Sequence, residues 1–118
     1  MSFNIYDLAA KEYATLQVPH PVTKVPTGAT VTVAGPASAE YEVQKARLGE
    51  LIKQGDLTQA QALAENAKFL AGCITGWTGM GVEFSPAEAV KLLEDKRMYE
   101  FKKWLDNEIT NVANFITA

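Results

Sequence analysis

The side chains that could carry out covalent chemistry are few in this chain, and no motif gathers them together. His20 is the only histidine and Cys73 the only cysteine. They could form the nucleophilic pair of a small thiol-dependent hydrolase only if the fold brought them side by side. His20 lies between two prolines, which favours an exposed loop. Cys73 follows an alanine-rich segment, which is typical of a small buried thiol near a helix C-terminus.

The acidic residues do not indicate a catalytic or metal site. The neighbours Glu94 and Asp95, and the pair Asp106 and Glu108, are spaced like surface charges on helices. The sequence has no Cys/His cluster and no Asp-x-Asp-x-Asp loop, so zinc and EF-hand calcium sites are not expected. We therefore expect no catalytic residue, no metal ligand and no cofactor, and we expect that the protein is not an enzyme.

A glycine-rich stretch, Gly76-x-x-Gly79-x-Gly81, resembles a ligand-binding loop only superficially. No Gly-Lys-Ser/Thr follows it and no strand is expected before it, which argues against a phosphate loop. The glycines favour a tight loop with positive φ angles. Trp77 and Phe84 flank them, and we expect these two rings to close the loop over the core.

Composition bounds the class of protein. The 118 residues are enough for one domain, and we expect a single domain over residues 1–118. The formal net charge of -3 argues against a general binder of nucleic acid. Mixed signs at helical spacing predict a solvated helix face for the one basic group, Lys96, Arg97, Lys102 and Lys103. No signal peptide or membrane span is recognisable, so we expect a soluble cytoplasmic protein without a membrane partner.

The elements that must position these residues divide the chain into three parts. Residues 1–18 are expected to contain a short amphipathic helix, capped by Asn4, with Ile5, Leu8, Ala9 and Tyr13 at helical spacing. Residues 19–36 are expected to form a β-hairpin. Its strands cover 22–25 and 29–34, and Pro26-Thr-Gly28 forms the turn. Because a lone hairpin is marginal in water, it must lie on the helices, pair with another copy or be mobile.

Residues 37–118 are expected to form a bundle of about four helices. The first runs from the cap Ser38 to about Gln54, with Gly55 as the residue after it. The second begins with the Thr58/Gln61 capping box. It carries the apolar stripe Leu63, Ala67, Leu70 and Ile74.

The third helix covers 86–93, with Ser85 as N-cap, Pro86 in the first position and Glu88 completing a capping box. The last runs from about Lys96 to Phe115, and its apolar stripe is Met98, Phe101, Leu105, Ile109, Val112 and Ile116. Asp95 could cap it, which leaves open whether the last two helices are distinct or form one bent helix. The expected fold class is mainly α with some α+β character: a small helical bundle with an N-terminal β-hairpin.

Two parts of the sequence resemble a known family. The segment Gly28-Ala-Thr-Val31-Thr-Val33-Ala-Gly35-Pro-Ala-Ser38-Ala-Glu-Tyr41 resembles small proteins of the tail gene clusters of tailed phages. Ile74-Thr-Gly-Trp77, followed by Phe84-Ser85-Pro86-Ala-Glu88 and Leu92-Leu93, is similar to the tryptophan and capped helix of tail assembly chaperones. The resemblance covers roughly residues 28–116. One departure is a short loop after Trp77, which lacks the acidic insert often seen there.

The resemblance implies a mostly α-helical, non-enzymatic morphogenesis factor in the host cytoplasm. Such proteins bind the tape measure protein, keep its long helix soluble and help to recruit the tail tube protein, and this chain would correspond to the short form. We expect a homo-oligomer, because self-association is a common way to build apolar binding surface. The residues expected to mark the fold are Trp77, Phe84, Ser85, Pro86 and Glu88. Partner contact is expected on the hairpin and on Phe101, Trp104 and Ile109.

Two other classes of function stay open at this point. The chain could be a virion structural protein, such as a head–tail connector or a minor tail component. Presence in purified virions would favour that class, because a chaperone should be absent from them. The thiol-dependent hydrolase with Cys73 and His20 is the more distant alternative.

Overall fold

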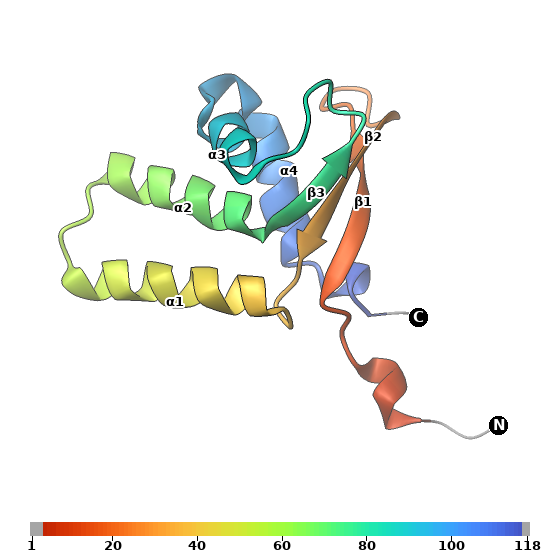
Figure 1. Ribbon diagram of the computed structural model, residues 1–118, viewed down its shortest axis with the longest axis horizontal. Coiled ribbons are helices and arrows are strands. Elements are labelled where there is room, and N and C mark those ends of the chain that lie inside the picture. The colour runs from red at the N-terminus through yellow and green to blue at the C-terminus, as the bar shows by residue number, and fades with distance from the viewer. Residues whose placement is uncertain (1–3, 117–118) are drawn as a thin grey trace.

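The computed structural model describes residues 4–116, which form an α+β fold rather than a helical bundle (Figure 1). Helices hold 54% of these residues and strands hold 19%. The strands are β1 (Tyr13–Pro19), β2 (Pro26–Ala34) and β3 (Ile74–Thr78), and they form one antiparallel sheet in the order β1-β2-β3. The expected bundle with an isolated hairpin is therefore wrong, because a third strand from the middle of the chain completes a sheet.

The hairpin lies earlier in the chain than the sequence predicts. β1 pairs with β2 from Tyr13 opposite Ala34 to Pro19 opposite Pro26. The predicted strand 22–25 is part of the connection, and the predicted turn Pro26-Thr-Gly28 lies inside β2. The reason is the alternation along β1, which turns Ala14, Leu16 and Val18 towards the core and leaves the residues between them exposed.

The first element is shorter than the predicted N-terminal helix. Residues Ile5–Leu8 form a single 3-10 turn, η1. The Asn4 cap is confirmed, because its side chain accepts a hydrogen bond from the Tyr6 N–H at 3.0 Å. Tyr13 does not belong to a helix but starts β1.

β3 is the element that the sequence did not predict. α2 ends at Cys73 and the chain continues directly into the strand at Ile74. Trp77 lies opposite Val31, and Ile74 lies opposite Val33. Only five residues long, the strand is too short to show a clear alternation, although its Ile, Trp and Thr residues favour strands.

The helices begin and end close to the predicted positions. The caps Ser38 and Ser85, the Thr58/Gln61 capping box and the left-handed Gly55 after the first helix are confirmed. The extended backbone of Asp95 separates the last two helices, so they are distinct. The predicted helix over 96–115 is broken into three pieces. The helical elements are α1 (Ala39–Gln54), α2 (Gln59–Cys73), α3 (Pro86–Glu94), η2 (Lys96–Met98), α4 (Tyr99–Ile109) and η3 (Val112–Asn114).

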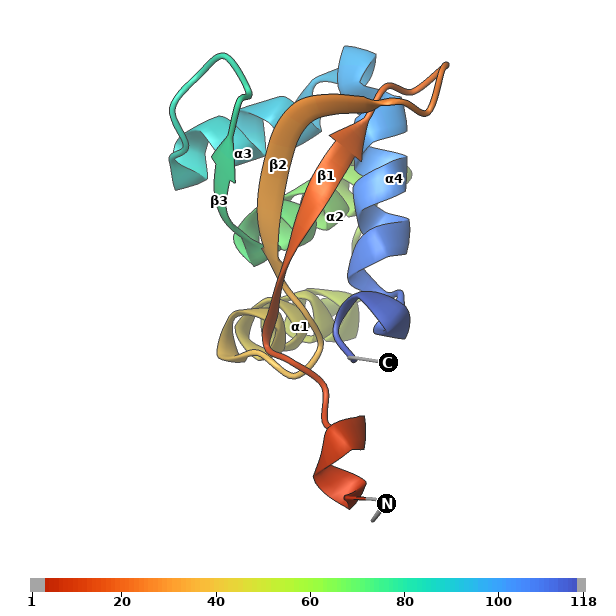
Figure 2. The same ribbon diagram turned by 90° about the vertical axis from the view of Figure 1, so that its right-hand side faces the viewer.

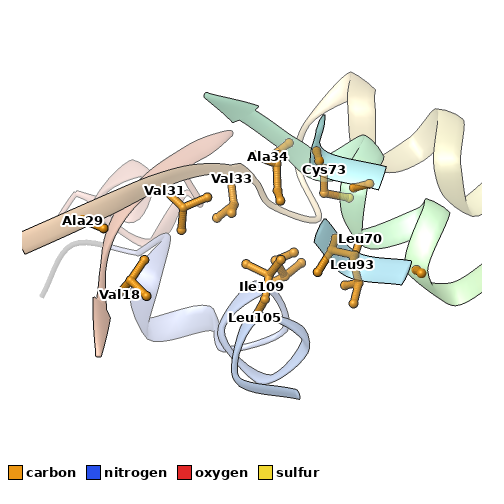
Figure 3. Close-up of a cluster of buried hydrophobic side chains, with 14 of the residues drawn as sticks. Val18, Ala29, Val31, Val33, Ala34, Leu70, Cys73, Leu93, Leu105 and Ile109 are labelled. Atoms are coloured by element: carbon orange, nitrogen blue, oxygen red, sulfur yellow. The ribbon is translucent and has the colours of Figure 1, made fainter. Parts of the chain in front are cut away.

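The core lies between one face of the sheet and the helices α2, α3 and α4 (Figures 2 and 3). Val31 and Val33 of β2 are fully buried there. The helices contribute Leu70, Cys73, Leu93, Leu105 and Ile109. The other face of the sheet is lined by threonines, whose hydroxyls meet across the strands, as in the 3.0 Å contact between Thr15 and Thr32.

α1 and α2 form a helical hairpin that projects from the rest of the fold (Figure 1). α1 has no fully buried residue. Ile52 of α1 and Leu63, the first residue of the predicted α2 stripe, are 62% and 57% exposed. The α2 stripe is therefore buried only in its second part, at Ala67, Leu70 and Ile74. Among the helices of residues 4–116, none has both the length and the apolar character that a membrane span requires.

Candidate partner-binding groove

A groove of about 370 Å³ lies between the β1–β2 connection and the start of α4. We call it the α4 groove. Its lining comes from two segments that are far apart in the sequence: Val18, Pro19, Pro21, Lys24 and Thr27 on one side, and Arg97, Met98, Glu100, Phe101, Lys103, Trp104 and Asn107 on the other. Figure 2 shows the β1–β2 connection beside the start of α4, and residues of these two segments line the groove.

Two aromatic rings form the α4 wall of the groove. Phe101 and Trp104 are three residues apart and therefore share one face of α4. Their ring centroids are 5.8 Å apart and the ring planes are inclined at 39°. Both side chains are half-buried, because they also pack against the core. The core thus holds the two rings in place while the groove leaves part of them accessible.

Ile109, the third residue expected to contact a partner, does not line the groove. Its side chain is 1% exposed and belongs to the core beside Leu105. It lies five residues, or roughly 1.4 turns, after Trp104 along α4, on the side that meets the sheet. Ile109 is therefore a core residue.

The opposite wall is a loop held by its own hydrogen bonds. His20 Nδ1 accepts hydrogen bonds from the backbone N–H groups of Val22 and Thr23, at 3.1 and 3.3 Å. The Lys24 backbone has a φ of 64°, and its Nζ donates to the Pro21 carbonyl at 2.8 Å. The loop therefore has a defined shape. The sequence analysis predicted a strand over residues 22–25 of this loop. Only the prolines and valines of the loop indicate an exposed apolar wall.

The rim of the groove is positively charged although the chain as a whole is acidic. Three basic side chains and one acidic side chain line it. Arg97 is neutralised by Asp95, whose carboxylate accepts from Nη2 at 2.7 Å, and these hydrogen bonds lower the pKa of Asp95 to about 2. Within residues 4–116, no ion pair involves Lys24 or Lys103. The two lysines are thus available to an acidic group on a partner.

Trp77 and Phe84, two of the residues expected to mark the fold, hold the segment that links β3 to α3. The rings of Trp77 and Phe84 meet edge to face, with centroids 5.1 Å apart and an angle of 82°. Trp77 Nε1 donates to the Val82 carbonyl at 2.9 Å. Both rings pack on the core, as the sequence predicts. Trp77 itself lies on β3 rather than in a loop.

The cap of α3 is simpler than a capping box. Ser85 Oγ accepts a hydrogen bond from the Glu88 N–H at 3.1 Å, and Pro86 stands at the start of the helix. In the part of the chain that the structure describes, no bond returns from the Glu88 side chain to Ser85. These three residues set where α3 begins, and they do not line the α4 groove.

The glycines of the loop support its shape. Gly79 and Gly81 have φ angles of 70° and 83°, as predicted, whereas Gly76 lies in β3 and does not have a positive φ. A Cβ at Gly79 would lie 3.1 Å from the Ala29 Cα, so the loop passes directly against β2. The expectation that no strand precedes the loop is wrong, because β3 does. The loop still lacks the Gly-Lys-Ser/Thr that a phosphate loop requires.

His20 and Cys73 are not brought together. His20 follows Pro19, which pairs with Pro26, whereas Cys73 precedes Ile74, which pairs with Val33. The two β2 partners are seven residues apart, or roughly 23 Å along a strand. Cys73 is also 0% exposed, and burial raises the pKa of its thiol to about 12. The pair therefore cannot act as a nucleophile and its base in this fold.

Metal binding has no candidate cluster either. Residues 4–116 contain no group of three or more His, Cys, Asp or Glu side chains placed to hold an ion. The α4 groove combines two partly accessible aromatic rings with two lysines that form no ion pair within residues 4–116.

No family model, no curated protein and no solved structure matches this chain. The similarity to tail assembly chaperones consequently rests on the sequence motifs around Trp77 and Gly28, and the role of the α4 groove is argued from its geometry.

Proposed function

We propose that this protein is a non-enzymatic tail assembly chaperone of a tailed phage, and that it binds an apolar helical segment of the tape measure protein. The observation that carries the proposal is the α4 groove, in which Phe101 and Trp104 stand side by side on one helix face. Large aromatic side chains dominate the energetics of protein interfaces, especially where they are held rigid.

The apolar lining and the lysines of the groove suit an amphipathic helix. Such a helix inserts apolar side chains at every third or fourth position into a groove of this kind. Lys24 and Lys103 at the rim would pair with acidic residues beside those apolar positions, which favours one orientation of the partner. A tape measure helix that aggregates alone has the apolar surface that this groove would cover. In this proposal the threonine-lined face of the hairpin is left for the tail tube protein.

Co-purification with the tape measure protein tests the proposal. The two proteins are expressed together and separately, and solubility and complex formation are measured by size-exclusion chromatography with light scattering. We expect a soluble complex and an insoluble tape measure protein when it is expressed alone. Trp104→Ala removes part of the groove wall, and Pro21→Asp places a charge in it from an exposed position. Both variants should lose the complex.

Val43→Asp is the matched control, because Val43 is 63% exposed on α1 and does not line the groove. It should retain the complex. No complex with the unaltered chain, together with its presence in mature particles, would overturn the proposal and favour a virion structural protein. Loss of the complex in Val43→Asp alone would place the binding surface on the helical hairpin.

A further inference from the structure

We infer that a second copy of this chain occupies the α4 groove with its η1 segment. Ile5, Tyr6 and Leu8 of η1, which we call the η1 peg, would insert between Phe101 and Trp104 on one wall and the β1–β2 connection on the other. The inference goes beyond the proposed function, since it concerns contact between copies of the chain and requires no tape measure protein.

The η1 peg is an exposed apolar cluster. Ile5, Tyr6 and Leu8 are 63%, 81% and 55% exposed. The hydrogen bonds that shape the segment are local, from the Tyr6 N–H to Asn4 and from the Ala9 N–H to the Tyr6 carbonyl. Both views show η1 lying away from the body of the fold (Figures 1 and 2). Apolar side chains gathered in this way mark a contact with another molecule.

The peg and the groove match in size and character. The groove holds about 370 Å³, and a cavity of about 150 Å³ is enough for one benzene ring. The groove therefore has room for two or three apolar side chains. Val18, Pro19 and Met98 add apolar surface to the two rings, and they lie where aliphatic side chains such as Ile5 and Leu8 would be covered.

The charges also agree. The sequence of η1 carries one charged residue, Asp7. The rim of the groove carries Lys24 and Lys103, which take part in no ion pair within residues 4–116. An acidic segment that enters a basic rim is favoured over a neutral or basic one.

The peg cannot reach the groove of its own chain. The start of β1 is fixed by hydrogen bonds from the Lys11 N–H to the Phe115 carbonyl, at 2.6 Å, and from the Gly35 N–H to the Glu12 carbonyl, at 2.8 Å. Three residues link Leu8 to Lys11 and span at most roughly 11 Å. The groove lies at the far end of β1, about 20 Å further on. Figure 2 shows η1 and the β1–β2 connection at opposite ends of the molecule.

Two copies can exchange pegs in a closed dimer, or the peg of one copy can enter the groove of the next in a heterologous contact. Contacts of this kind generate rings if the rotation closes, and open filaments if it does not. They also leave one peg and one groove unpaired in any open assembly. The same groove receives the client in the proposed function, so a client segment would compete with the peg.

A complementation experiment on the chain alone tests the inference. The peg variant is Ile5→Asp/Leu8→Asp, and the groove variant is Pro21→Asp/Lys103→Glu; all four positions are exposed, so both variants should fold. Mass is measured by light scattering over a range of concentrations. We expect the unaltered chain to form a dimer or a larger assembly and each variant alone to be monomeric. An equal mixture of the two variants should form a dimer, because one intact groove and one intact peg remain.

The other outcomes overturn the inference. A monomeric unaltered chain at all concentrations would show that the peg and groove do not meet. Assembly that persists in either variant would place the contact on another surface. If the two variants stay monomeric when mixed, the intact peg of one does not bind the intact groove of the other. The proposed function is tested independently of these results, since its complex requires the tape measure protein.

Discussion

The ring of Phe115 lies so close to Gly35 that a Cβ at this glycine would be 2.5 Å from Cε1 of the ring. Phe115 is 2% exposed and its carbonyl accepts the hydrogen bond from Lys11. Gly35 directly follows β2, and its carbonyl accepts a hydrogen bond from the Ser38 hydroxyl at 2.7 Å. One contact thus joins the last turn of the described chain to the start of β1 and to the cap of α1.

This relationship makes Gly35→Ala destabilising. The added methyl group has to displace a buried ring, and overpacking of this kind costs about 1–3 kcal/mol. Gly49→Ala is the matched control, because a Cβ at Gly49 would meet nothing within 4 Å and Gly49 lies inside α1. Alanine should stabilise that helix by about 1 kcal/mol. Urea denaturation of both variants measures the two changes, and equal effects of the same sign would contradict the packing argument.

The buried thiol of Cys73 makes stability depend on pH in the alkaline range. Burial raises the pKa of the thiol from its ordinary value of 9.0 to about 12. Below pH 9 the thiol keeps its proton in both the native and the unfolded state, so burial of the neutral thiol makes its full contribution to stability. Between about pH 9 and 12 only the unfolded state loses it, and stability falls by up to about 1.4 kcal/mol per pH unit.

Comparison of the unaltered chain with Cys73→Ala isolates this contribution from other groups that titrate in the same range. The difference in unfolding free energy between the two proteins should be constant below pH 9 and shrink above it. The same burial predicts that a disulfide reagent labels Cys73 slowly in the native state and rapidly in urea. Rapid labelling of the native protein would contradict it.

The helix caps were predictable because each is a local pattern. Ser38, Thr58 and Ser85 supply a side-chain oxygen to an N–H three residues later, and that geometry depends on neighbouring residues only. The third strand was not predictable in this way. β3 exists because β2 presents a free edge to residues 74–78, and pairing between segments that are far apart in sequence leaves no local pattern.

The candidate site was predictable only where it depends on a local pattern. Phe101 and Trp104 share a helix face, which their spacing indicates. The other wall depends on how β1 pairs with β2, and the prediction placed the hairpin turn at Pro26-Thr-Gly28 instead of residues 20–25. Helical spacing also could not separate Ile109, which faces the sheet, from the two rings that face the groove.

The projecting helical hairpin should tolerate polar substitutions at its exposed apolar positions. Ile52→Ser and Leu63→Ser change side chains that are 62% and 57% exposed, so each should alter the unfolding free energy by less than about 0.5 kcal/mol. Leu70→Ala, on the same face of α2 as Leu63 but fully buried, should cost about 2–5 kcal/mol. Thermal unfolding followed by circular dichroism compares the three. A large loss for Leu63→Ser in the monomer would show that the distal half of α2 is covered.

The two tryptophans allow occupancy of the α4 groove to be followed directly. Trp104 lines the groove, whereas Trp77 packs edge to face on Phe84 and does not line it. Trp77→Phe leaves Trp104 as the only tryptophan, at the cost of the hydrogen bond to the Val82 carbonyl, which is worth about 0.5–1.5 kcal/mol. The fluorescence emission of Trp104 in this variant should shift to longer wavelength on dilution, because the groove empties and the indole becomes hydrated.

Two matched variants serve as controls for this measurement. Trp77→Phe combined with Ile5→Asp/Leu8→Asp should show the long-wavelength emission at every concentration, since no peg fills the groove. Trp104→Phe, which retains Trp77, should show no change on dilution. Addition of a tape measure segment should return the Trp104 emission to shorter wavelength in the peg variant. Emission from Trp104 that does not depend on concentration, peg or client would mean that the α4 groove stays open in solution.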